Sequence, residues 1–157
     1  MKVFSFCLFE SEENKNNYHA KKGRITPRQK SILYKVGLYK NLEMIKKFFP
    51  EWHVFLYTNI KSKHIDHCKN AFSNFQVFDV QDERYYIRLG MTLSRFGPLG
   101  DDRITHVVCR DLDNYINEES VGIINGWLES KKSFLITENR LPRVSDAKNP
   151  RIQRFIL

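Results

Sequence analysis

Short apolar runs rich in β-branched and aromatic residues alternate along this chain with amphipathic helix patterns, and this alternation limits the folds open to it. The strand-like runs cover residues 2–9, 53–58, 75–80, 104–109 and 133–137. The helix patterns cover residues 31–49, 61–72 and 117–129, while residues 84–96 are helical or irregular. Strands that alternate with helices favour a parallel sheet with helical crossovers. The sequence therefore predicts an α/β fold, with a mainly parallel, twisted sheet and flanking helices.

The length and the apolar runs predict the organisation of the chain. Its 157 residues match one domain of common size, so we expect a single domain with a core over residues 1–139 and an irregular tail over residues 140–157. No run approaches the roughly 20 apolar residues that cross a bilayer, and the first residues are typical of a strand rather than of a signal peptide. We therefore expect no membrane span and a cytoplasmic location.

Three cysteines are spread widely through the sequence, at positions 7, 68 and 109. They include no Cys-x-x-Cys pair, which argues against zinc binding or disulfide exchange by these residues. We expect reduced, buried thiols, with Cys7 and Cys109 on central strands of the sheet.

The formal charge of +8 is concentrated in one segment. Residues 15–47 contain ten Lys or Arg and a single acidic residue, Glu43. Part of this segment belongs to a long polar loop predicted over residues 10–30. Three interpretations are open: a solvated loop and helix face, a surface that binds RNA through phosphates and stacking, or a loop that closes over an anionic ligand. The last would use Lys21, Lys22, Arg24 and Arg28.

The most informative motif is Arg110-Asp111-Leu112-Asp113-Asn114, directly after the predicted strand 104–109. Ligands of open parallel sheets bind outside the carboxyl ends of the strands. If the segment is extended, Asp111 and Asp113 share a face while Leu112 points into the core. Two carboxylates suit a hard divalent cation such as Mg²⁺, with water and phosphate oxygens of a substrate completing the shell. The alternative is structural, with Asp113 or Asn114 capping the next helix.

The remaining motifs give weaker evidence of function. His64, His67 and Cys68 have a helical spacing that can chelate zinc, but no second ligand pair accompanies them, so a structural role is favoured. His19 and His106 match no catalytic signature. The sequence has no Gly-x-Gly-x-x-Gly, P-loop or Gly-x-Ser-x-Gly motif, which argues against dinucleotide-binding, NTPase and serine-hydrolase functions.

An ordered set of short motifs resembles the glycosyltransferase-like proteins of the GT-A type over residues 34–137. The matching pieces are Tyr34-Lys35-Val36-Gly37 with Asn41, Phe49-Pro50-Glu51-Trp52 with Tyr57, Arg95-Phe96 with Pro98 and Asp101, the Arg110-Asp111-Leu112-Asp113 motif, and the helix end at residues 126–130 with the following strand. The resemblance implies a Rossmann-like nucleotide-diphospho-sugar transferase fold.

The same resemblance implies a function and a set of site residues. The donor would be a nucleotide-diphosphate sugar at the ends of the first and fourth strands, and the acceptor a glycan or another hydroxyl compound. Asp111 and Asp113 would bind the ribose, the diphosphate or a Mn²⁺ or Mg²⁺ ion of the donor complex, and Arg95 and Arg110 would meet the diphosphate. Arg110 has an alternative, a structural salt bridge with Asp101 or Asp102. The alternative function is a basic nucleic-acid-binding module without catalysis. Because of the motif set, nucleic acid is the less favoured partner.

The chain departs from the family pattern after the predicted fifth strand. An Arg-Asp-His-Pro-like stretch follows the fifth strand in the family, whereas this chain has Glu138-Asn139-Arg140-Leu141-Pro142. The acceptor-side segment of the family lies beyond the matching region. We therefore expect weak binding of nucleotide diphosphate and slow sugar transfer unless a partner subunit or a longer chain completes the acceptor site.

Overall fold

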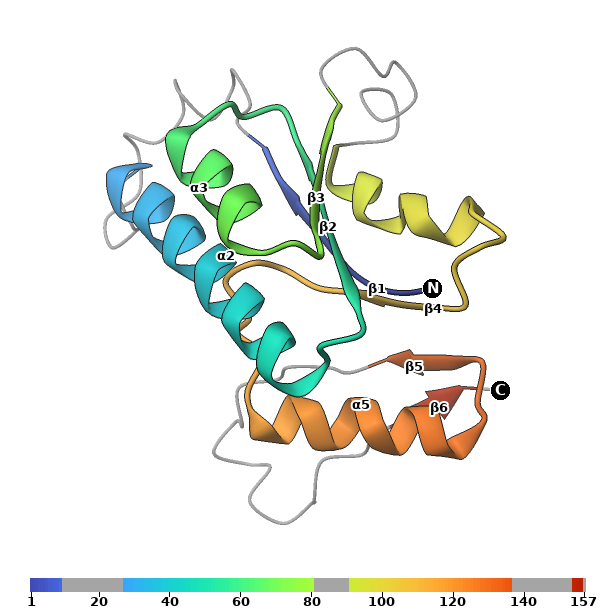
Figure 1. Cartoon of the computed structure of the whole chain (residues 1–157). Coiled ribbons are helices and arrows are strands. Elements are labelled where there is room, and N and C mark those ends of the chain that lie inside the picture. Colours follow the sequence, from blue (N-terminus) through green and yellow to red (C-terminus); the bar gives the residue numbers. More distant parts are fainter. Residues whose placement is uncertain (10–26, 81–90, 137–153, 157) are drawn as a thin grey trace, which may run out of the picture. The chain divides into compact units, whose positions relative to one another are not determined.

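The computed structural model describes residues 1–9, 27–80, 91–136 and 154–156 (Figure 1). It divides the chain into two compact units, Met1–Ile116 and Asn117–Leu157. The expectation of a single domain stays a prediction. The first unit contains, in order, β1 (Lys2–Leu8), α2 (Pro27–Phe48), β2 (His53–Thr58), α3 (Lys63–Ala71), β3 (Phe75–Asp79), the 3₁₀-helix η1 (Met91–Gly100) and β4 (His106–Cys109).

The first unit is built on a four-stranded sheet with the strand order β3-β2-β1-β4. Every neighbouring pair is parallel, with Val3 opposite His53 and Val107, and Val54 opposite Phe75. This confirms the expected α/β architecture with a parallel sheet and flanking helices. β2 has the predicted bounds, with a continuous apolar run over residues 54–57 between His53 and Thr58.

β1 is buried on both faces, as its continuous apolar run predicts. On one face the ring centroid of Phe4 lies 5.3 Å from that of Phe49 and 4.9 Å from that of Trp52. On the other face Val3 belongs to a buried cluster with Phe55, Tyr57 and Val80. Helices α2 and α3 cover the first face and η1 lies on the opposite side (Figure 1). Each large apolar side chain buried in this way stabilises the fold by about 1.5–3 kcal/mol.

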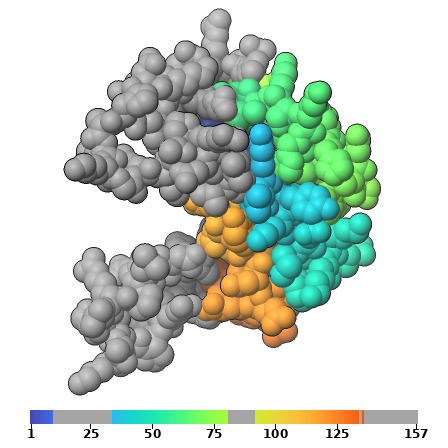
Figure 2. Space-filling model, turned by 90° about the vertical axis from the view of Figure 1, so that its left-hand side faces the viewer, coloured from blue at the N-terminus to red at the C-terminus, as the bar shows by residue number. Residues whose placement is uncertain are grey.

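Helices α2 and α3 pack directly against each other, and their surfaces adjoin in Figure 2. The ring centroids of Tyr39 and Phe72 are 5.6 Å apart, edge to face. His64 Nε2 donates a hydrogen bond of 2.8 Å to the carbonyl of Lys35. Ser62 caps α3 by accepting from the backbone N–H of Ile65. The two helices therefore form one layer on the sheet.

Helix α2 begins at Pro27, four residues before the predicted start at Ser31. Proline was expected to belong to the loop, but it is favoured in the first turn of a helix, where its missing N–H costs nothing. The rest of the predicted loop, residues 10–26, lies outside the described residues. The helix ends at Phe48, one residue before the predicted end at Phe49, and Pro50 follows as the predicted stop.

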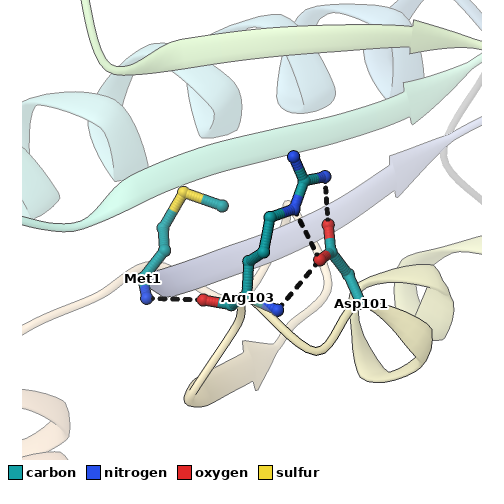
Figure 3. A network of polar contacts seen from close by, with 3 residues as sticks. All are labelled: Met1, Asp101 and Arg103. Carbon is teal, nitrogen blue, oxygen red and sulfur yellow. Dashed lines mark hydrogen bonds and ion pairs between the residues drawn. The ribbon is translucent and has the colours of Figure 1, made fainter.

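β4 begins at His106, later than the predicted residue 104. The reason is the register, because β1 begins at Lys2 and Lys2 lies opposite His106. The N–H of Thr105 donates to the carbonyl of Met1 at 2.8 Å, outside the paired strands. The amino group of Met1 donates to the carbonyl of Arg103, and Arg103 in turn binds Asp101 (Figure 3). The chain start is thereby tied to the segment before β4.

The cysteines differ from the expectation of buried thiols on central strands. β4 is an edge strand of this four-stranded sheet, so Cys109 lies at the edge and only Cys7, on β1, is central. Both are half-buried, since the carboxyl end of β1 is less buried than its middle and the whole of β4 is half-buried. Cys68, on α3, is buried. All three are free thiols.

The second unit contains α5 (Glu118–Ser130), β5 (Phe134–Ile136) and β6 (Arg154–Ile156). β5 and β6 pair antiparallel in a separate two-stranded sheet. Trp127 is buried, and its indole N–H donates to the carbonyl of Lys132 at 2.9 Å. Lys131 ends the helix in the left-handed conformation with φ 56°. Across both units, none of the helices that the structure describes is long and apolar enough to span a membrane.

Candidate metal and diphosphate site

The Arg110–Asn114 segment leaves the sheet through a turn. The N–H of Arg110 still donates to the carbonyl of Ser5 at 3.1 Å, which continues the ladder between β1 and β4. The N–H of Asn114 then donates to the carbonyl of Asp111 at 3.1 Å and closes the turn. The expectation of an extended segment is therefore wrong, because Asp and Asn at these positions favour a turn.

The side chains of this turn still separate as predicted. Leu112 is buried, with 1% of its surface exposed. Asp111 and Asp113 are both exposed. Both carboxylates thus remain accessible at the carboxyl edge of the sheet, while the leucine between them anchors the turn in the core.

This turn packs on helix α2 at two residues one helical turn apart, Gly37 and Asn41. The side-chain amide of Asn41 donates to the carbonyls of Gly37 and Leu112, at 2.9 and 3.1 Å. Its Oδ1 accepts from the N–H of Ile116 at 3.0 Å. Asn41 is completely buried, so these bonds satisfy groups that water cannot reach.

Gly37 allows the backbone of the turn to approach the helix closely. A Cβ at this position would lie 2.3 Å from the carbonyl oxygen of Leu112. Sequence reasoning used Gly37 and Asn41 only as part of a resemblance and missed their contact with the motif. Their spacing of four places them on one helix face, but the segment that this face contacts lies about seventy residues further along the chain.

η1 brings Arg95 to the same edge of the sheet. The guanidinium Nη1 of Arg95 forms an ion pair with Oδ1 of Asp111. The side chain of Arg95 is 23% exposed and that of Asp111 is 66% exposed. Two predicted site residues are thus in direct contact.

Two thiols hold η1 at this place. Cys109 Sγ donates to the carbonyl of Arg95 at 3.3 Å, and Cys7 Sγ donates to the carbonyl of Thr92 at 3.5 Å. Burial raises the pKa of Cys7, and it raises that of Cys109 to about 11, although the nearby Arg95 opposes both shifts. Both thiols are therefore protonated at neutral pH, which suits hydrogen-bond donors and not nucleophiles.

Arg110 binds neither of the aspartates expected as its structural partners. Its Nη2 donates to Oδ1 of Asn114 at 2.9 Å, across the turn. Asp101 pairs with Arg103 instead, at 2.7 Å. Burial lowers the pKa of Arg110, but the guanidinium stays charged at neutral pH. Its Nε is buried without a partner among the described residues. Arg110 therefore supports the turn and adds positive charge beneath it.

The capping alternative for the motif is wrong. Asn117 is the N-cap of α5, and its side chain accepts from the N–H of Ser120 at 2.9 Å. Neither Asp113 nor Asn114 takes this role. Asp113 forms no ion pair within the described part of the chain and is exposed.

The donor set of this site fits a hard divalent cation that a substrate helps to bind. Asp111 and Asp113 offer exposed carboxylate oxygens, the ligand type that Mg²⁺ and Mn²⁺ prefer. Among the residues that the structure describes, no group of three or more His, Cys, Asp or Glu is arranged to hold a metal ion. One or two carboxylates suffice for Mg²⁺ when substrate phosphates and water supply the other ligands.

The contacts of His64 on α3 favour a structural role over the zinc site considered for this helix. Its Nε2 is engaged by the Lys35 carbonyl and lies 3.9 Å from Cys68 Sγ. His67 is exposed and Cys68 is completely buried, so the two do not face a common open site. These contacts support packing of α3 on α2.

The basic segment is only partly described. Lys21, Lys22 and Arg24 lie outside the described residues, and nothing is described of the side chain of Arg28. On α2, Lys35, Lys40, Lys46 and Lys47 are exposed. Lys40 lies over the ring of Tyr115 at 5.2 Å and Lys46 over that of Phe72 at 5.7 Å.

No family model, curated protein or solved structure matches this chain. The case for its function therefore depends on the residues and geometry of this site.

Proposed function

We propose that the chain is a metal-dependent glycosyltransferase of the GT-A type, or its donor-binding part, with a Rossmann-like nucleotide-diphospho-sugar transferase fold. One observation supports this most: Arg95 and Asp111 meet at the carboxyl edge of β4, beside the exposed Asp113. This edge is where ligands of parallel α/β sheets bind. Carboxylates for a cation and guanidinium groups for phosphate are the two chemistries that a nucleotide-diphosphate donor requires.

Each residue has a proposed part. Asp111 and Asp113 hold Mn²⁺ or Mg²⁺, which when bound offsets the charge that develops on the departing nucleoside diphosphate. Arg95 binds and orients the diphosphate through its planar guanidinium. Arg110 adds positive charge beneath the turn, and Asn41 holds the turn on α2. The acceptor is a glycan or another hydroxyl compound.

Calorimetry with UDP- and GDP-sugars, each with and without Mn²⁺, tests this proposal. We expect binding that Mn²⁺ strengthens and that falls to the metal-free level in Asp113→Asn. Asp102→Asn is the matched control, because Asp102 is also an exposed carboxylate of the first unit but lies before β4. Equal binding by both variants would remove Asp113 from the site.

Nucleic-acid binding is the second candidate, and the exposed lysines of α2 favour it. Such binding would not need a metal and would weaken steeply with salt, because it releases counterions. If folded wild-type protein binds no nucleotide sugar with Mn²⁺ but binds RNA in this manner, the second candidate replaces the first.

A further inference from the structure

The ion pair between Arg95 and Asp111 joins two groups with opposite tasks in the proposed site. Asp111 must face a cation, and Arg95 must face an anion. In the structure they neutralise each other through Nη1 and Oδ1. Arg95 is the more buried partner, with 23% of its side chain exposed, so water replaces its lost contact only in part.

A ligand with a single charge gains little at such a site. A lone divalent cation that approaches Asp111 meets the positive charge of Arg95, and a lone diphosphate that approaches Arg95 meets the negative charge of Asp111. A cation and a diphosphate that bind together replace both partners at once. Neither side chain is then left without an opposite charge.

We propose that Arg95 is a specificity-determining residue, because its ion pair with Asp111 must be exchanged for a metal and a diphosphate together. This inference rests on the proposed function. By linkage, each of the two ligands should strengthen the binding of the other, and part of that coupling should depend on the ion pair. The site would thereby reject free nucleotides and free metal in favour of the metal–diphosphate complex.

The test compares Asp111→Asn with Asp113→Asn in the absence of metal. Both variants remove one negative charge from the same turn, but only Asp111→Asn releases Arg95. In EDTA, titrated with UDP and with GDP, Asp111→Asn should bind nucleotide about two- to fivefold tighter than Asp113→Asn, the range expected for a partly exposed ion pair. With Mn²⁺ present, both variants should bind more weakly than wild type.

The reciprocal experiment uses the arginine side of the pair and Mn²⁺ alone. Arg95→Gln should bind Mn²⁺ more tightly than wild type, as measured by electron paramagnetic resonance. Arg103→Gln is the matched control, since Arg103 also pairs with an aspartate, Asp101, and should leave Mn²⁺ binding unchanged. Circular dichroism checks that every variant is folded.

The outcomes separate the inference from the proposed function. Equal metal-free nucleotide affinity for the two aspartate variants, together with unchanged Mn²⁺ binding by Arg95→Gln, would overturn the exchange but leave metal-dependent donor binding intact. Failure of folded wild type to bind UDP or GDP with Mn²⁺ would overturn the proposed function, and the exchange with it.

Discussion

Gly37 is a position where one added methyl group has no room. In Gly37→Ala the new Cβ would lie 2.3 Å from the backbone oxygen of Leu112, so the turn or the helix must shift. Overpacking of this kind costs about 1–3 kcal/mol, while the better helix propensity of alanine returns about 1 kcal/mol. We expect a net loss in the free energy of unfolding, measured by urea denaturation.

Gly122→Ala is the control for this prediction. Gly122 also lies within a helix, α5, but an added Cβ there has no atom within 4 Å. It should gain about 0.5–1 kcal/mol from helix propensity alone. A gain of similar size in Gly37→Ala would contradict the close contact of the turn with α2.

Asp101 makes the stability of the protein depend on acid pH. Hydrogen bonds from the Arg103 side chain and backbone N–H lower the pKa of Asp101 to about 2. The unfolded chain has the ordinary pKa of about 4, so the folded state is favoured above that pH. The contribution is lost as the pH falls from about 4 to about 2.

Asp101→Asn should therefore lower the free energy of unfolding by a constant amount above about pH 4, and the difference from wild type should shrink toward pH 2. Urea denaturation at several pH values measures it. A difference that stays the same down to pH 2 would show that Asp101 is not ionised in this network.

Lys131 controls how α5 ends. It is the residue with a positive φ among the non-glycine residues that the structure describes, and its φ of 56° lies in the left-handed region. A side chain in that region costs about 1–2 kcal/mol, and glycine avoids the cost. Lys131→Gly should raise the free energy of unfolding by up to about 1 kcal/mol, after allowance for the entropy of glycine in the unfolded state.

Thermal denaturation monitored by circular dichroism checks this expectation. Lys131→Ala serves as the control, because it removes the charge and the long side chain without relieving the backbone. If alanine stabilises as much as glycine, the left-handed conformation is not the cause.

The strands and the two α-helices of the first unit were predictable because their signals are local, whereas η1 continues to Gly100, past the predicted end at residue 96. The apolar runs of β1 and β2 and the stripe of α2 identify buried faces without knowledge of any partner. Boundaries that depend on a partner remote in sequence were missed. β4 starts at His106 because Lys2 of β1 lies opposite it. The N–H groups of Thr105 and Arg110 donate to carbonyls of Met1 and Ser5, about a hundred residues earlier in the chain. β6 lies in a segment without periodicity, and its partner β5 lies about twenty residues earlier.

The candidate site was predictable as a set of residues but not as a geometry. The sequence indicated Asp111 and Asp113 by type and position, and Arg95 and Arg110 through the family resemblance. It did not indicate that the motif forms a turn, that Arg110 binds Asn114, or that Arg95 binds Asp111. These contacts depend on the placement of η1 and α2, which no local pattern specifies.

At the scale of the whole molecule, the net charge of +8 should cause salt-sensitive association with polyanions. We expect fluorescence anisotropy with a short single-stranded RNA to show weak binding. The logarithm of the association constant should fall linearly with the logarithm of the salt concentration. Removing Lys35 and Lys40 together, as Lys35→Gln and Lys40→Gln, should reduce that slope by about 1.4 if both contact phosphates. Asp113→Asn should leave the slope unchanged, and an unchanged slope in the double lysine variant would exclude this face of α2.

Each of the two compact units contains one tryptophan, so the chain has a separate optical reporter for each. Trp52 is buried beside Phe4 in the first unit, and Trp127 is buried in the second. In Trp127→Phe the emission spectrum reports only on Met1–Ile116, and in Trp52→Phe it reports only on Asn117–Leu157. Because a buried indole shifts its emission to longer wavelength when water reaches it, the two variants would reveal whether the units melt in one transition or in two.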